Sequence, residues 1–89
     1  MRLGRAMNIR VRFSAGLVPL AGNTRMTVAL PEAATVTDLL QHLQTEHPAM
    51  ASGLDKAVPM IAGRHVAHSE QLSAGQEVSL LLPVSGGST

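Results

Sequence analysis

Two consecutive glycines near the end of the chain are the residues whose type and position could carry chemistry. The residues that follow Leu82 are Pro83, Val84, Ser85, Gly86, Gly87, Ser88 and Thr89. Because glycine has no Cβ, a Gly-Gly stem can enter a channel that is too narrow for other residues. An ATP-dependent enzyme could adenylate a carboxylate on such a stem and so turn an inert acid into a reactive acyl group. This pattern indicates a protein that acts as a substrate or carrier.

The four histidines are a second candidate for chemistry, but their spacing does not favour a metal site. His42 and His47 lie on different faces of a predicted helix, and His65 and His68 lie on opposite sides of an extended segment. The sequence has no Cys, so it offers no thiolate nucleophile, disulfide or cysteine zinc ligand. No oxyanion donor or Gly-rich phosphate loop is evident either. We therefore expect no bound metal, no bound cofactor and no active site in the body of the domain.

Length and composition indicate one small domain with an aliphatic core. A chain of 89 residues buries only about 60 to 65% of its unfolded surface. Apolar residues make up 45% of the sequence and aromatic residues only 1%, so Phe13 must pack among aliphatic side chains. No stretch approaches the roughly 20 apolar residues of a membrane span, and the first residues do not lead into a signal-peptide core. These features predict a soluble cytoplasmic protein that does not enter a membrane.

The charge distribution argues against a nucleic-acid-binding protein. The formal net charge is only +1. Five arginines precede the first acidic residue, Glu32, and they are Arg2, Arg5, Arg10, Arg12 and Arg25. Nucleic-acid binding would need aromatic stacking platforms or a clustered basic motif, and the sequence has neither. We expect no nucleic-acid partner.

The residues before the Gly-Gly pair alternate between apolar and polar in several short runs, which predicts strands with one buried face. The predicted strands span residues 7–13, 25–30, 57–62 and 77–82, and a short extended segment at 65–67 follows a turn at Gly63 and Arg64. In the last strand, Val78 and Leu80 face the core and Leu81 faces away from it. Pro83 lacks an N–H group, so it ends the pairing and frees the tail from the sheet.

One helix is predicted between the second and third strands, at residues 36–47. Thr35 and Asp38 have the spacing of a capping box, and Pro48 ends the helix. Its apolar stripe consists of Val36, Leu39, Leu40 and Leu43. The connection at residues 14–23 has room for one helical turn.

A lone helix can bury its stripe only against one face of a single sheet, so the predicted fold class is two-layer α+β. The sheet has four or five strands and one main helix on one face. It is mixed if the last strand lies parallel to the first. Residues 1–6 form an N-terminal extension, residues 7–84 the domain, and residues 85–89 a flexible tail that contains the Gly-Gly pair.

The run from Glu77 to Gly87 resembles the end of the MoaD and ThiS type of sulfur carriers, which are ubiquitin-like β-grasp proteins. The shared pattern is a hydrophobic strand, a Pro-Val step, a small residue and Gly-Gly, and the resemblance extends from Met7 to Gly87. It implies that an E1-like adenylyltransferase uses ATP to activate the terminal glycine, which becomes a thiocarboxylate. The thiocarboxylate then donates sulfur to a synthase.

The same resemblance implies the roles of individual residues. Gly87 would bear the thiocarboxylate. The residues that the partner would recognise in the tail are Gly86, Ser85, Val84 and Pro83. The residues of the partner interface would be Leu81, Arg10, Arg12 and Met60, with Leu81 as an apolar contact and Arg10 and Arg12 beside it on the open sheet face. A solvated edge residue is the ordinary alternative for Leu81.

The chain departs from the family pattern at two positions. Leu82 stands where MoaD proteins usually have a first proline, and Ser88 and Thr89 follow the glycine pair, where mature carriers end. A carboxylate on Thr89 would be displaced and its side chains would obstruct a narrow channel. We therefore expect a precursor that is cleaved after Gly87, and the resemblance implies a trimming metalloprotease, as in some relatives.

Three alternatives to a free sulfur carrier stay open. The chain could be the small subunit of molybdopterin synthase, in which case it would assemble with a large subunit. It could also be a ubiquitin-like modifier that is joined to lysines through Gly87. A pure interaction domain would make no use of residues 86–89, so their deletion would have no consequence.

Overall fold

The computed structural model describes residues 6–82. Residues 1–5 and 83–89, and with them the predicted tail at 85–89 and the Gly-Gly pair, lie outside the described residues. The strands are β1 (Ala6–Phe13), β2 (Arg25–Pro31), β3 (Val58–Ile61), β4 (Arg64–His65) and β5 (Glu77–Leu81). The helices are α1 (Val18–Ala21), α2 (Val36–Glu46), the 3-10 helix η1 (Pro48–Met50) and α3 (Ala51–Leu54).

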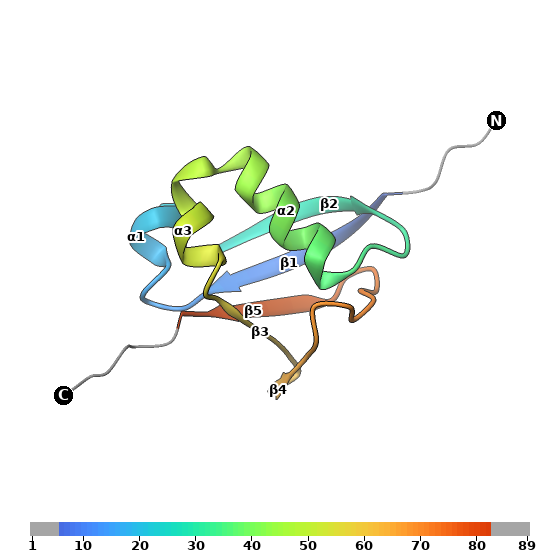
Figure 1. The fold of residues 1–89 in the computed structure, drawn as a ribbon. Helices are drawn as coiled ribbons and strands as arrows, with labels where there is room; N and C mark the ends of the chain where they lie inside the picture. Colours follow the sequence, from blue (N-terminus) through green and yellow to red (C-terminus); the bar gives the residue numbers. More distant parts are fainter. Residues whose placement is uncertain (1–5, 83–89) are drawn as a thin grey trace.

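The five strands form one mixed sheet in the order β2-β1-β5-β3-β4. β1 and β5 pair in parallel, and every other neighbouring pair is antiparallel. Helix α2 lies across one face of this sheet, and α1, η1 and α3 gather at one end of it (Figure 1). This topology confirms the predicted α+β fold with a β-grasp arrangement. β1 begins at Ala6, one residue before the predicted start of the domain.

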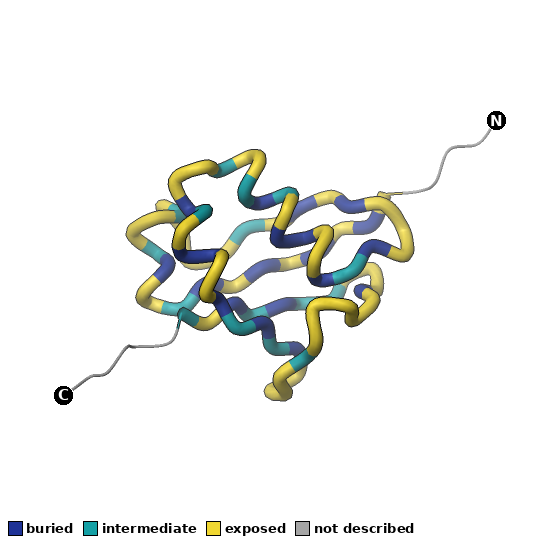
Figure 2. Tube along the Cα trace, in the orientation of Figure 1, coloured by how far each residue is buried: buried dark blue, intermediate teal, exposed yellow. Residues whose placement is uncertain are grey.

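The alternation in the sequence decides which side chains enter the core. Along β1, every second residue is buried, from Met7 to Phe13, and the residues between them are exposed (Figure 2). Val78 and Leu80 of β5 are fully buried, as predicted, and Leu82 packs partly against the same core. Met26 of β2 is only partly buried. The predicted stripe of α2 is buried throughout and consists of Val36, Leu39, Leu40 and Leu43.

The N-terminus of α2 is held by its own capping box and by the loop before β5. The Thr35 N–H group donates to Asp38 Oδ2 over 2.8 Å, and the Asp38 N–H group donates to Thr35 Oγ1 over 3.4 Å, so the predicted capping box is confirmed. The next free N–H groups of the helix, those of Val36 and Thr37, donate to the carbonyls of Glu70 and His68. The loop therefore completes the cap that the helix needs.

Replacing Thr35 with Ala is expected to lower the free energy of unfolding by about 1 kcal/mol, because the Asp38 N–H group loses its acceptor. Urea unfolding of the full chain measures this change. Thr45→Ala, on the exposed surface of the same helix, is the control for the intrinsic gain in helix propensity. Unchanged stability of Thr35→Ala relative to the unsubstituted chain would show that the cap contributes nothing.

Two local features differ from the sequence predictions. The turn between β3 and β4 uses Ala62 and Gly63, with φ of 53° and 78°, where the sequence predicted Gly63 and Arg64. Two successive positive φ angles are typical of the type I′ turn that suits the twist of a hairpin. The second difference is the helical segment at residues 48–54, which the sequence analysis does not predict. There, a Cβ on Gly53 would come within 2.7 Å of a methyl group of Leu17, so any larger residue would require the buried Leu17 side chain to shift.

Within residues 6–82, no helix has both the length and the hydrophobicity that a transmembrane helix requires.

Candidate functional site

Leu81 lies on the sheet face that α2 does not cover, which we call the open face. Its side chain is 37% exposed, although its neighbour Leu80 is fully buried. The alternation along β5 explains this difference, since successive side chains point to opposite faces of a sheet. Across the ladder to β3, Leu81 pairs with Val58, which is half-buried. The two side chains form an apolar spot on the open face.

Arg12 of β1 lies beside this apolar spot. It pairs with Ser79, the residue two positions before Leu81 on the same face of β5. A hollow of about 380 Å³ joins the two strand ends, and its lining residues are Arg12, Phe13, Ser14, Ala15, Ser79 and Leu81. The structure therefore brings Arg12 and Leu81 together at the end of β5.

Arg10 lies further from Leu81 than Arg12 does. It pairs with Glu77, and its guanidinium donates to the carbonyl of Gly75 over 3.3 Å. It lines a second hollow of about 200 Å³, together with Arg25 and Glu77. Arg25 lies directly opposite Arg12 in the β1–β2 ladder. Three arginines thus occupy adjacent positions on the open face, and the sequence analysis had not included Arg25 among the site residues.

Met60 lies on the far side of β5 from the arginines. It is half-buried and pairs with Ser79 on one side and His65 on the other. One row across all five strands therefore reads Arg25, Arg12, Ser79, Met60 and His65. Such a row presents a basic side next to an apolar one, and this mixture suits a protein surface that is acidic at its rim.

The predicted tail residues follow directly after this surface in the chain. β5 ends at Leu81 and Leu82 is the last described residue, so the predictions for Pro83, Val84, Ser85, Gly86 and Gly87 concern residues outside those described. Two hydrogen bonds hold the strand end. The Ser14 N–H group donates to the Leu80 carbonyl over 3.0 Å, and the Leu82 N–H group donates to Ser14 Oγ over 3.0 Å. The point at which the tail starts is therefore attached to the end of β1.

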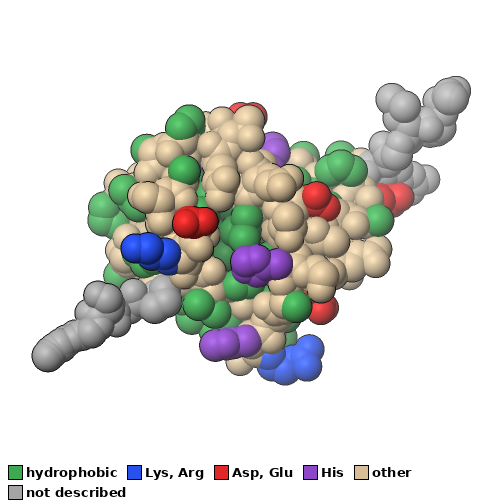
Figure 3. Space-filling view, viewed as in Figure 1, with side chains coloured by type: hydrophobic (Ala, Val, Ile, Leu, Met, Phe, Trp, Pro, Cys, Tyr) green, Lys and Arg blue, Asp and Glu red, His purple; other side chains and the backbone are tan. Residues whose placement is uncertain are grey.

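The histidines and acidic residues do not assemble into a metal site in the described part of the chain. Among residues 6–82, no three side chains of His, Asp or Glu lie close enough to hold a metal ion. In the view of Figure 3, charged and histidine side chains are scattered over the surface. His65 and His68 are exposed, and His42 and His47 are half-buried.

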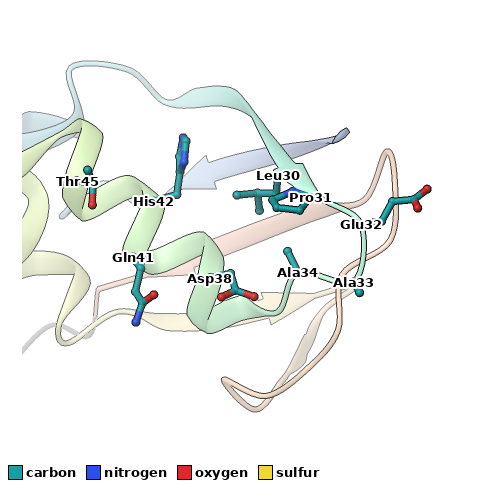
Figure 4. A pocket seen from close by; sticks show the side chains of 9 residues that line it. All are labelled: Leu30, Pro31, Glu32, Ala33, Ala34, Asp38, Gln41, His42 and Thr45. Carbon is teal, nitrogen blue, oxygen red and sulfur yellow. The ribbon is translucent and has the colours of Figure 1, made fainter. Parts of the chain in front are cut away.

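A separate hollow of about 440 Å³ lies between α2 and the loop that leads to it (Figure 4). His42, Gln41 and Thr45 come from α2, and Glu32 lies in the loop with its carboxylate directed outward (Figure 4). Asp38 also lines this hollow, but it is engaged in the capping box. The loop between β2 and α2, which lines this hollow, lies at the other end of the sheet from the end of β5 (Figure 1). Its residues form no constellation that suggests catalysis.

Comparison with known proteins decides which family this arrangement represents. The model of the ThiS family matches residues 11–87. The chain belongs to the ThiS family. The match of this ThiS-family chain begins within β1, at Val11, covers every later described strand and continues through the Gly-Gly pair to Gly87.

Similar proteins include carriers and modifiers of the same size. The molybdopterin synthase sulfur carrier subunit of Chlamydomonas reinhardtii is 32% identical over 91% of this ThiS-family chain and 100% of the relative. The structure of SAMP1, small archaeal modifier protein 1, from Haloferax volcanii is 32% identical, with a TM-score of 0.80, over 90% of this chain and 99% of that one. A putative molybdopterin converting factor subunit 1 from Pyrococcus furiosus is 28% identical, with a TM-score of 0.78, over 88% and 99%. The ubiquitin-like β-grasp fold is thereby confirmed.

Sequence analysis missed three residues of the surface around Leu81 in this ThiS-family chain. Val58 pairs with Leu81, Ser14 binds the backbone at the end of β5, and Arg25 extends the basic side. Arg25 and Val58 both lie in predicted strands. Their place beside Arg12 and Leu81 follows only once the strand order and register are known. Ser14 follows β1 directly, and only the parallel pairing of β1 with β5 brings it to Leu82.

Proposed function

We propose that this ThiS-family chain is a sulfur carrier that works through a thiocarboxylate on Gly87. The observation that carries the proposal is that the family match runs through the Gly-Gly pair and stops at Gly87. The role of the Chlamydomonas relative, named as a sulfur carrier subunit, supports the same assignment. The body of the domain is then the part of the chain that partner enzymes bind.

The chemistry needs two steps, both at the carboxylate of Gly87. First, a carboxylate oxygen attacks the α-phosphorus of ATP, pyrophosphate leaves, and an acyl adenylate forms. Hydrosulfide then attacks the acyl carbon, the C–S bond forms, and AMP leaves with the bridging oxygen. The product is a thiocarboxylate, and no oxidant or reductant is required. The partner, an E1-like adenylyltransferase, binds ATP, and the carrier itself binds no cofactor.

Cleavage after Gly87 precedes activation in this proposal. Ser88 and Thr89 place side chains beyond the glycine pair, where they would obstruct a channel that admits only glycine. The reacting carboxylate also has to lie at a fixed distance from the docked body. A protease, which we expect to be a metalloenzyme, therefore supplies the reactive end by hydrolysing the peptide bond between Gly87 and Ser88.

The open face is the docking surface for these partners. Leu81 and Val58 supply an apolar centre, and Arg12 with its neighbours supplies a basic rim. Charges at the rim of an interface mainly guide association and register. We therefore expect the activating enzyme and the sulfur-accepting synthase to present an apolar patch with acidic residues around it.

A second function, protein modification, is favoured by the similarity to SAMP1. A lysine amine would then attack the acyl adenylate in place of hydrosulfide, and an amide bond to Gly87 would result. A third role, as the small subunit of molybdopterin synthase, follows from the name of the Chlamydomonas relative. Both alternatives keep the same activated Gly87 and differ in the group that accepts it.

The experiment uses a version of the chain that ends at Gly87. Incubation with ATP, sulfide and the adenylating enzyme encoded in the same genome is expected to raise its intact mass by the exchange of one oxygen for one sulfur. Omitting ATP is expected to prevent the change, because an unactivated carboxylate does not react with sulfide. The full chain ending at Thr89 serves as the matched control and is expected to remain unmodified.

Several outcomes separate the alternatives. If the mass of the Gly87-ending chain stays unchanged with an adenylating enzyme that is shown to be active on another carrier protein, the sulfur-carrier function is refuted. Branched peptides in which the C-terminal segment of this chain is joined through Gly87 to lysines of other proteins, found after proteolysis of cells that express the chain, would favour the modifier. Co-purification with a large synthase subunit would favour the subunit role.

A further inference from the structure

The end of β1 continues its pairing with β5 for one step beyond the regular strand. In the parallel ladder, Arg10 pairs with Glu77 and Arg12 with Ser79, so the same register places Ser14 opposite Leu81. A parallel ladder requires the N–H group of Ser14 to donate to the Leu80 carbonyl, and it does so over 3.0 Å. The same ladder requires the next N–H group, that of Leu82, to donate to the Ser14 carbonyl.

The Ser14 carbonyl cannot accept this last bond because it is already used elsewhere. The chain turns after Ser14, and this carbonyl accepts the N–H groups of Leu17 (2.9 Å) and Val18 (3.2 Å) at the start of α1. The side chain of Ser14 supplies the acceptor instead, since its Oγ accepts a hydrogen bond from the Leu82 N–H group over 3.0 Å. Pro83 follows without an N–H group, so this bond is the last that the backbone of β5 can donate before the tail.

Gly16 supports the same residue from the side. A Cβ on Gly16 would lie 3.1 Å from Leu82 Cδ2 and 3.3 Å from Leu82 Cβ, so the leucine side chain rests directly on the glycine backbone. Leu82 is partly buried against the core. Its backbone and its side chain are therefore both held by the segment from Ser14 to Gly16, which we call the Leu82 seat.

We propose that Ser14 is a positioning residue for the activation of Gly87, because it fixes the residue from which the tail starts. This inference rests on the proposed carrier function. The body docks through the open face, and the tail must carry Gly87 to one point in the partner's active site. A fixed Leu82 limits the directions that the next residues can take, so more of the docked complexes are productive. Loss of the seat lowers kcat and leaves docking unchanged.

The first experiment tests the seat in the full chain without any enzyme. Ser14→Ala removes the acceptor, and it is expected to speed amide hydrogen exchange at Leu82 by about fivefold, the change that corresponds to one neutral hydrogen bond. Ser14→Thr keeps a hydroxyl and is expected to retain the protection. The amide of Val78, in the middle of β5, is the internal reference and is expected to change little in both variants. Unchanged exchange at Leu82 in Ser14→Ala would overturn the proposal.

The second experiment measures activation kinetics on versions that end at Gly87, with the adenylating enzyme of the same genome. Ser14→Ala is expected to lower kcat for thiocarboxylate formation about fivefold, with KM changed less than about twofold, since the apolar side chains of Leu81 and Val58 and the arginines of the open face are unchanged. Ser14→Thr is expected to restore kcat. A simple loss of folded protein would instead raise the apparent KM and lower the melting temperature. Equal kcat for Ser14→Ala and the unsubstituted chain would contradict the positioning role.

A double-mutant cycle shows whether Ser14 acts through the Leu82 N–H group. Leu82→Pro removes this donor, so adding Ser14→Ala in that background is expected to change kcat by less than about twofold. A further loss as large as in the unsubstituted background would mean that Ser14 acts elsewhere and would overturn the assignment. If the unsubstituted chain is not activated at all, the proposed carrier function fails, whereas the exchange experiment still decides whether the seat exists.

Discussion

Replacing Leu81 with Asp is expected to lower kcat/KM for activation of the Gly87-ending chain by about 30-fold or more. Leu81 is the exposed apolar side chain at the centre of the open face, and Arg12 lies in the same hollow. An Asp at this position removes apolar contact area and places a carboxylate where the proposed acidic partner surface would approach. The change is expected mainly in KM, because docking and not chemistry is weakened. Initial rates of pyrophosphate release at several carrier concentrations measure it.

Leu20→Asp is the matched control for this prediction. Leu20 in α1 is 38% exposed, almost the same as Leu81 at 37%, and its side chain lies beside Gly53 of α3, not in the sheet. We expect its effect on kcat/KM to stay within about twofold, as is usual for surface residues outside an interface. Melting temperatures of both variants confirm that each is folded. Equal losses in the two variants would place the docking surface somewhere other than the open face.

Deleting Ser85 from the Gly87-ending chain is expected to lower kcat for activation by about 100-fold or more, although both glycines remain. One residue fewer shortens the reach of the tail by about 3.3 Å. Misplacement of a reacting atom by about 1 Å can already cost about 100-fold in rate. KM is expected to stay nearly constant, since the body still docks. Single-turnover formation of the acyl adenylate measures the effect.

Ser85→Ala keeps the length and is the control for the deletion. Its kcat is expected to remain within about threefold of the unsubstituted value, because only one hydroxyl is lost. Leu81→Asp and the deletion of Ser85 therefore separate the two parts of the proposed carrier: the open face should govern KM and the tail should govern kcat. If the deletion leaves kcat unchanged, activation does not depend on the distance between the domain and the carboxylate of Gly87.

Much of the fold could be predicted because the relevant signals are local. The alternation along β1, the apolar stripe of α2 and the capping box of Thr35 and Asp38 are confirmed, since each depends on residues close in sequence. The helical segment at residues 48–54 could not be found this way. Its helices are short and depend on contacts such as Gly53 against Leu17. The left-handed conformation of Ala62 could not be predicted either, because alanine rarely adopts a positive φ.

The candidate site could be predicted in part. Alternation along β5 correctly placed Leu81 on the exposed face. The grouping of Leu81 with Arg12, and the separation of Arg10 toward Glu77 and Gly75, follow from the register of strands that are more than 60 residues apart in sequence. The role of Ser14 depends in addition on a turn that occupies its carbonyl. Periodicity contains no information on either. The roles assigned to Gly87 and the other tail residues stay predictions.

The position of β5 between β1 and β3 has a consequence for synthesis of the protein in the cell. The strand that is translated last fills the middle of the sheet, so the ribosome has to release it before the first and third strands can be joined. A nascent chain that stops early lacks Val78 and Leu80, two of its fully buried residues, and cannot complete the core. Folding is thereby coupled to the synthesis of β5. Any molecule with a folded sheet has therefore been translated through Leu81, just before the residues to which we assign the activation.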